Sequence, residues 1–102
     1  MSLSNKHKRF LRGLTHGIHP LVTIADKGLT GAVRQELETA LDFHELVKTK
    51  IRCDRNQRTT LITTICADFD CELVHAIGQV ASFYRANAEK PRIELPGAGN
   101  RS

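Results

Sequence analysis

Residues 21–53 read LVTIADKGLTGAVRQELETALDFHELVKTKIRC, and the order of patterns within this stretch decides the fold. Residues 21–25 are apolar and rich in β-branched side chains, which predicts a short buried strand. After a turn of sequence DKG, Thr30 can cap a helix over residues 31–43, whose apolar side chains form a stripe at helical spacing. Residues 45–53 then alternate between apolar and basic side chains, which is typical of a half-buried strand.

The sequences on either side of this stretch supply the remaining elements. Ser4 can cap the first helix, and Gly17 is expected to end it in a left-handed conformation. A polar connection follows the second strand, and a tight Gly-Gln turn joins the last two strands. These flanking elements are a helix over 5–15, a helix over 57–69, and strands over 72–77 and 80–85. The predicted class is α/β, a single-domain layer sandwich of order α-β-α-β-α-β-β with a mixed sheet.

Length and composition fit one globular domain. The chain has 102 residues, of which 40% are hydrophobic and 25% charged. We expect the domain to cover residues 1–96, and residues 97–102 to form a disordered tail. No apolar run is long enough for a membrane span or a secretory signal, so we expect a cytoplasmic protein with no membrane partner. The three cysteines show no CxxC spacing, which favours reduced thiols without a metal or other cofactor.

Basic and acidic segments alternate along the chain, whose formal net charge is +4. Residues 1–27 hold five bases and one acid, and residues 48–60 hold the same numbers. Residues 28–47 and 61–79 each carry a net charge of −3. If folding places the two basic segments on one face, the protein has the electrostatic outline of a polyanion binder.

The loop Ala25-Asp26-Lys27-Gly28 is the sharpest candidate site. A strand-to-helix loop with a cation and a glycine lets backbone N–H groups approach phosphates, and the following helix adds its positive dipole end. KH domains clamp the backbone of a single nucleic-acid strand with a GxxG loop of this kind. The same residues also fit a purely structural turn, in which Gly28 only supplies a positive φ.

The stretches HPLVTIADKGLT, LETALDFHELVKTKI and VHAIGQVASFYR together resemble the CRM domain (chloroplast RNA splicing and ribosome maturation), and more narrowly its stand-alone bacterial form, the YhbY family. The resemblance covers residue 2 to about residue 96. It implies a four-stranded mixed sheet with three helices, similar to the C-terminal domain of bacterial translation initiation factor three. It also implies binding to structured RNA, and for a bacterial single-copy member a link to ribosomal RNA in precursors of the large ribosomal subunit.

The family's GxxG loop falls on Ala25-Asp26-Lys27-Gly28, where alanine replaces the first glycine. Further phosphate contacts are expected from cations on the first helix and on the second strand. These residues are Lys6, Lys8, Arg9 and Arg12 on the helix, and Lys48, Lys50 and Arg52 on the strand.

Two other function classes remain open. The acidic helices predict, as an alternative, a protein-interaction module that binds a ribosomal protein or another assembly factor. A DNA-binding role for the basic helix is disfavoured, because the sequence has no recognisable helix-turn-helix pair. No nucleophile motif occurs, so we expect neither an enzyme nor a small-molecule substrate.

Overall fold

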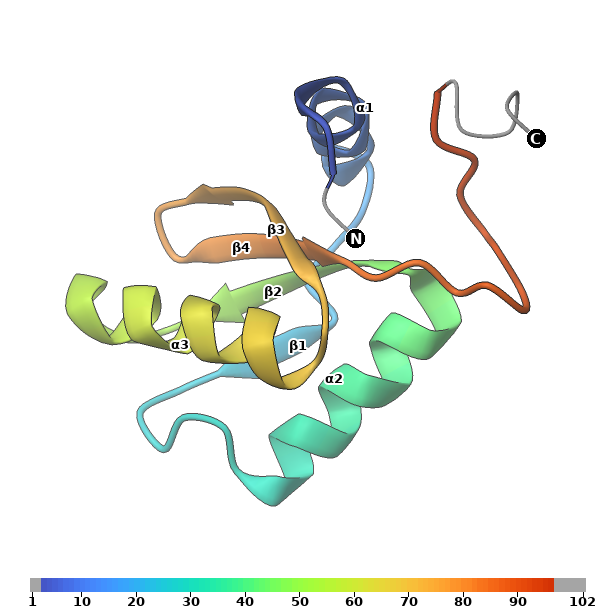
Figure 1. Ribbon diagram of the computed structural model, residues 1–102. Helices are drawn as coiled ribbons and strands as arrows, with labels where there is room; N and C mark the ends of the chain where they lie inside the picture. Colours follow the sequence, from blue (N-terminus) through green and yellow to red (C-terminus); the bar gives the residue numbers. More distant parts are fainter. Residues whose placement is uncertain (1–2, 97–102) are drawn as a thin grey trace.

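The computed structural model describes residues 3–96, and Figure 1 shows their arrangement. Within this range the helices and strands follow one another in the predicted order. They are α1 (Asn5–Thr15), β1 (Val22–Ile24), α2 (Gly31–His44), β2 (Leu46–Ile51), α3 (Arg55–Asp68), β3 (Glu72–Ile77) and β4 (Val80–Tyr84). The predicted α/β class is therefore confirmed. Residues 1–2 and 97–102, which include the expected disordered tail, lie outside the described residues.

The four strands form one mixed sheet in the order β1-β2-β4-β3. β1 and β2 are parallel, with Val22 opposite Thr49 and Ile24 opposite Ile51. β4 is antiparallel to both of its neighbours, β2 and β3. Because parallel strands need a crossover connection, α2 packs back onto the sheet between β1 and β2. The mixed four-stranded sheet is as predicted.

The helices cover both faces of the sheet. α2 and α3 lie on one face and α1 lies on the other, as Figure 1 shows. The larger core lies between the sheet and helices α2 and α3, and it contains Leu37, Leu41, Ile65 and the fully buried Phe83. A smaller cluster lies under α1. Its buried members are Leu3, Leu11, Leu46, Val74, Tyr84 and Leu95.

Each helix begins at a polar residue that accepts a backbone hydrogen bond. Ser4 and Thr30 cap α1 and α2 as predicted, accepting from the N–H groups of His7 at 3.1 Å and Val33 at 3.2 Å. The start of α3 differs from the prediction, since the helix begins at Arg55 and not at residue 57. The reason is that Asp54 Oδ1 accepts from the N–H of Gln57 at 2.8 Å, which makes Asp54 the cap.

The end of α1 also differs from the prediction. Gly17 is not among the described glycines with positive φ, so the expected left-handed stop is wrong. The Lys48 ammonium instead donates hydrogen bonds to the carbonyl oxygens of Thr15, at 3.0 Å, and Ile18, at 3.3 Å. A cation at a helix C-terminus satisfies carbonyls that have no partner within the helix and complements the helix dipole. Lys48 thereby fixes α1 to the sheet.

Glu45 is a buried carboxylate between α2 and β2, with only 1% of its surface exposed. Its oxygens accept hydrogen bonds from the backbone N–H groups of Asn87 at 2.6 Å, Arg92 at 2.7 Å and Ile93 at 2.8 Å. Three backbone donors compensate a buried carboxylate that forms no ion pair within residues 3–96. The segment after β4 is therefore held in one path, which brings Leu95 to the cluster under α1.

We expect Glu45→Ala to lower the free energy of unfolding by about 2–4 kcal/mol, because three backbone N–H groups lose their acceptor. Glu45→Gln keeps one acceptor oxygen and should cost about half as much. Urea denaturation measures both losses, and limited proteolysis within residues 86–96 reports the release of the segment. Glu36→Ala, at an exposed position, is the matched control and should change stability by less than about 0.5 kcal/mol. Equal stability of all three variants would contradict this role of Glu45.

Candidate nucleic-acid interface

The loop after β1 is a hydrogen-bonded turn. The N–H of Gly28 donates to the carbonyl oxygen of Ala25 at 2.8 Å, and Gly28 has a φ of +69°. A residue with a Cβ is strained at such a φ, so this position requires glycine or a residue that tolerates the left-handed region. Ala25 is not among the residues with positive φ. Alanine in place of the family's first glycine therefore causes no backbone strain.

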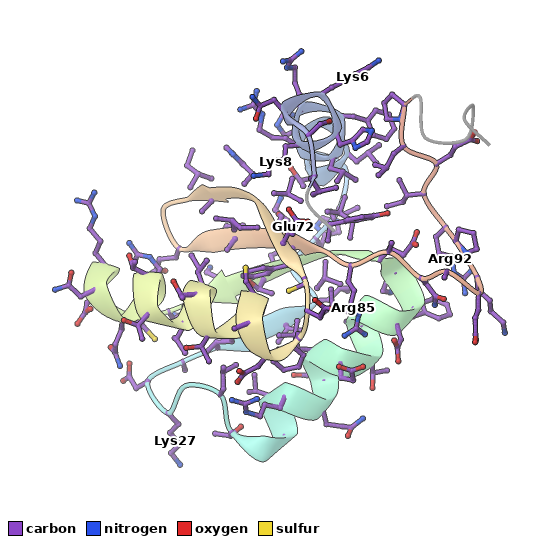
Figure 2. All side chains as sticks on the ribbon, in the orientation of Figure 1. Lys6, Lys8, Lys27, Glu72, Arg85 and Arg92 are labelled. Atoms are coloured by element: carbon purple, nitrogen blue, oxygen red, sulfur yellow. The ribbon has the colours of Figure 1, made fainter. Side chains whose placement is uncertain are left out.

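The tip of the turn leaves polar groups free for an anion. The N–H groups of Asp26 and Lys27 have no hydrogen-bond partner within residues 3–96, and both residues are exposed. Figure 2 shows the Lys27 side chain pointing away from the protein into solvent. Two adjacent N–H groups beside an ammonium suit a phosphate, and the neighbouring Asp26 carboxylate reduces the local positive potential.

A groove separates the turn from the start of α3. It is lined by Gly28 from the turn and by Asp54, Asn56, Gln57, Thr60 and Leu61. The helix over 31–43 is predicted to supply the positive dipole end at this loop, but the first turn of α3 lines the groove. Contacts between distant segments bring them together: Arg52 donates its N–H to the Ile24 carbonyl at 2.7 Å, and the Cys53 Sγ donates to the Ala25 carbonyl at 3.4 Å.

Arg52, Arg55 and Arg58 bring further positive charge to this end of the sheet. Arg52 and Arg55 are exposed, so their guanidinium groups are accessible to a ligand. Arg58 is different, since its Nη1 donates to the Cys53 carbonyl at 2.6 Å and supports the β2–α3 connection. We call Lys27, Arg52 and Arg55 the loop cluster. Sequence reasoning selected the first two of these and missed Arg55, which it placed in a polar connection.

A second basic area lies along α1. Lys8, Arg9 and Arg12 line a shallow groove together with Asn5 of the same helix and Val74 of β3. We call these three cations the α1 cluster. Lys6 is exposed, but in Figure 2 its side chain and that of Lys8 leave α1 in different directions. The structure thus brings together three of the four helix cations selected from the sequence.

The packing of α1 gives the predicted cations of β2 different roles. Lys48 is half-buried and its ammonium is occupied by the two carbonyls at the end of α1. Lys50 is exposed and pairs with Thr23 and Val80 on the neighbouring strands. Lys50 is therefore free to contact a ligand, whereas Lys48 serves the fold.

Lys27 of the loop cluster and Lys8 of the α1 cluster are well separated. Figure 2 shows them on opposite sides of the molecule, with the sheet between them. Lys50 and Arg52 follow Lys48 at alternate positions, so their side chains leave the sheet on the face that α1 covers. This face therefore carries these two cations as well as the α1 cluster, whereas Lys27 lies apart on the turn. A polyanion that contacts both Lys27 and the α1 cluster must extend around the end or the edge of the sheet.

The acidic residues of α2 and α3 are largely used within the protein. The Arg85 guanidinium contacts Glu38 at 3.0 Å and Asp42 at 2.7 Å, and hydrogen bonding to Glu38 raises the pKa of Arg85. Arg34 pairs with Asp68 at 2.9 Å. Since these carboxylates already have cationic partners, they present less charge to another protein than the sequence suggests.

Burial favours the thiol form of Cys66 and Cys71. All three cysteines are free, and Cys53 and Cys71 are buried. Burial raises the pKa of Cys71 to about 12 and also raises the pKa of Cys66. Residues 3–96 contain no group of three side chains suited to hold a metal ion. No helix in the same range is long and apolar enough to cross a membrane.

The geometry can be compared with that of known proteins. The family model of the CRS1 / YhbY (CRM) domain matches residues 3–85. The chain belongs to this family. Two bacterial relatives are each 38% identical over 96 residues, the "RNA-binding protein" of Haemophilus influenzae and the "Probable RNA-binding protein PA4753" of Pseudomonas aeruginosa. Both alignments cover 93% of this chain, with 96% of the first relative and 91% of the second.

A solved structure supports the same relationship. The solution structure of SAV1595 from Staphylococcus aureus, described as a candidate RNA-binding protein, superposes with a TM-score of 0.80 at 31% identity. The match covers 93% of this chain and 100% of that one. The CRM family membership and the fold inferred from the sequence are confirmed.

Substitutions of Lys48 and Lys50 test whether the first lysine stabilises the fold and the second stays free. Lys48→Met keeps the apolar stem but removes both hydrogen bonds to α1, so we expect a loss of about 1–2 kcal/mol in the free energy of unfolding. Lys50→Met is the matched control and should cost less than about 0.5 kcal/mol. Urea denaturation of both variants checks this. Equal losses would show that the Lys48 ammonium does not hold α1.

Proposed function

We propose that this CRM-family protein binds structured RNA and acts as an assembly factor on precursor ribosomal RNA of the large subunit. The single observation that carries the RNA contact is the turn at Asp26 and Lys27. It presents two unbonded N–H groups and a free ammonium at one exposed point. The names of the two bacterial relatives support the same ligand class.

Recognition would proceed mainly through the RNA backbone. Cations and free N–H groups bind phosphates, which position a ligand but do not read its bases. Base stacking on a protein surface needs neighbouring exposed aromatic side chains. Phe69, Phe83 and Tyr84 are buried, and the two exposed phenylalanines, Phe10 and Phe43, lie on different helices. The loop cluster would contact one part of the RNA and the α1 cluster another. Because Lys27 and the α1 cluster lie on different sides of the molecule, a folded RNA fits this arrangement better than a short single strand.

The proposed location and the proposed lack of a cofactor and of catalysis follow from RNA as the ligand. A protein that works on ribosomal precursors in bacteria does so in the cytoplasm, and we place it there. Binding through backbone N–H groups and cations needs no cofactor and involves no chemical step, so we propose an RNA-binding protein without catalytic activity. The alternative function, a protein-interaction module that binds through the acidic helices, is less favoured. Arg34 and Arg85 already pair with carboxylates of α2 and α3.

The loop cluster can be tested by removing two of its cations together. Lys27→Ala with Arg52→Ala should weaken binding to a structured fragment of large-subunit ribosomal RNA. The slope of log affinity against log salt should fall in magnitude by about two, one for each lost phosphate contact. Fluorescence anisotropy over a range of salt concentrations measures both effects. Lys90→Ala, another exposed cation, is the control. An unchanged slope in the double variant would remove the loop cluster from the interface.

The ribosomal part of the proposal needs a separate test. In a sucrose gradient of cell extract, the protein should sediment with precursors of the large subunit and should move to the top of the gradient after RNase treatment. The double variant at the loop cluster should shift toward the top without RNase. Sedimentation as a free small protein under all conditions would contradict the ribosomal role, even if the purified protein binds RNA.

A further inference from the structure

An apolar groove runs between β1 and α2. Its apolar lining comes from Leu21 and Val22 on one side and from Ala32, Val33, Ala40 and Phe43 of α2 on the other. Leu21 and Phe43 are large hydrophobic side chains that are 49% and 56% exposed. This groove shares no residue with the loop cluster or the α1 cluster. An apolar surface of this kind, bounded by polar residues, is typical of a binding site for another molecule.

One wall of this groove is an open strand edge. β1 lies at the end of the strand order, so β2 is its one neighbour in the sheet. The Ile24 carbonyl points toward β2, because it accepts a hydrogen bond from the N–H of Arg52. Backbone groups of successive residues point to opposite sides of a strand, so those of Thr23 point to the open edge of β1. No strand of the described sheet lies on that side of Thr23. The strand edge beside the groove therefore offers a donor and an acceptor to an added strand.

The charge at this groove favours a basic ligand. Glu36 is exposed and lines the groove, whereas the cation that contacts a lining side chain, Arg92, lies over Phe43 at the far end of the described groove. Glu36 also forms no ion pair within residues 3–96, unlike Glu38 and Asp42 on the same helix. An uncompensated carboxylate repels the phosphates of RNA and attracts a lysine or arginine.

The second wall sets the length of the ligand. The lining residues of α2 extend from Ala32 to His44, which corresponds to about 18 Å of helix. An extended chain advances about 3.3 Å per residue, so roughly five residues fill the groove. Arg92 lies over the Phe43 ring, with its guanidinium carbon 4.6 Å from the ring centroid, and fixes the ring at one end.

We propose that the groove between β1 and α2 binds an extended peptide segment of a basic partner protein, which adds as a strand to the edge of β1. Backbone hydrogen bonds to Thr23 give the segment its register, and alternate apolar side chains enter the groove. A lysine or arginine of the segment meets Glu36. The site is distinct from the proposed RNA surface, so one molecule can hold RNA and a basic protein segment at the same time.

The test starts from selection with a defined probe. A phage-displayed library of random nonapeptides is selected on the full-length protein, with Leu21→Asp, Phe43→Asp double-variant protein for counter-selection. We expect enriched peptides to combine apolar residues at alternate positions with at least one lysine or arginine. A synthetic peptide of the enriched sequence is then titrated by fluorescence anisotropy. Failure to enrich any sequence over the counter-selected protein, or enrichment of acidic peptides, would overturn the proposal.

Substitutions at Thr23 separate strand addition from apolar contact alone. Thr23→Pro removes the outward N–H, a change that an edge strand tolerates, and should weaken the peptide at least tenfold. Thr23→Val keeps the N–H and is the matched control, with unchanged affinity expected. Glu36→Lys keeps the apolar lining but reverses the charge, and should weaken the same peptide at least tenfold. Circular dichroism confirms the fold of each variant, and equal affinity of the Thr23→Pro and Thr23→Val proteins would exclude an added strand.

Two further measurements test whether RNA or a second copy of the chain occupies the groove instead. Affinity for ribosomal RNA should be unchanged in a Leu21→Ser, Phe43→Ser protein, which removes the apolar surface without adding charge, and its loss would assign the groove to RNA. Sedimentation equilibrium of the wild-type protein should show a monomer. A dimer that dissociates in the same double variant would assign the groove to a second copy of the chain and overturn the proposal.

Discussion

The buried carboxylate of Glu45 joins segments of this structure that lie far apart in the sequence. Its oxygens hold three backbone N–H groups of the segment after β4, and its own carbonyl accepts from the N–H of Arg85. The segment then carries Leu95 to α1, where the Pro96 carbonyl lies 3.1 Å from the His7 ring. A residue at the junction of α2 and β2 thus helps to hold the first helix, because a desolvated carboxylate needs hydrogen-bond donors from whichever segment can supply them.

The same principle governs which charges remain available for binding. Lys48 is bonded to carbonyls of the α1 end, Arg58 to the Cys53 carbonyl, and Arg85 to two carboxylates of α2. These cations stabilise the packing of the elements. Lys27, Lys50 and Arg52 are exposed, and they contribute positive potential without a structural partner of that kind. The net charge of the sequence therefore overstates the basic surface, and the free cations define it more closely.

The arrangement of layers divides the surface into regions with different chemistry. α1 brings a basic area to its face of the sheet, and the turn after β1 brings Lys27 to the end of the sheet. The outer edge of β1 carries an apolar groove with one carboxylate. An RNA surface and a peptide surface can coexist on so small a domain because the short sheet leaves an edge, an end and a face accessible at once.

The sequence by itself determined the order of the elements, the caps at Ser4 and Thr30, the turn at Gly28 and the family. These features depend on local periodicity, on side chains that reach their own backbone, and on motifs that are continuous in the chain. The tertiary structure alone decided that Lys48 caps α1 from β2, that the first turn of α3 flanks the loop, and that Lys27 lies apart from the α1 cluster. Each of these facts depends on a contact between segments far apart in sequence. Which cations stay free is set by those contacts, and the pattern of residues along the chain does not encode them locally.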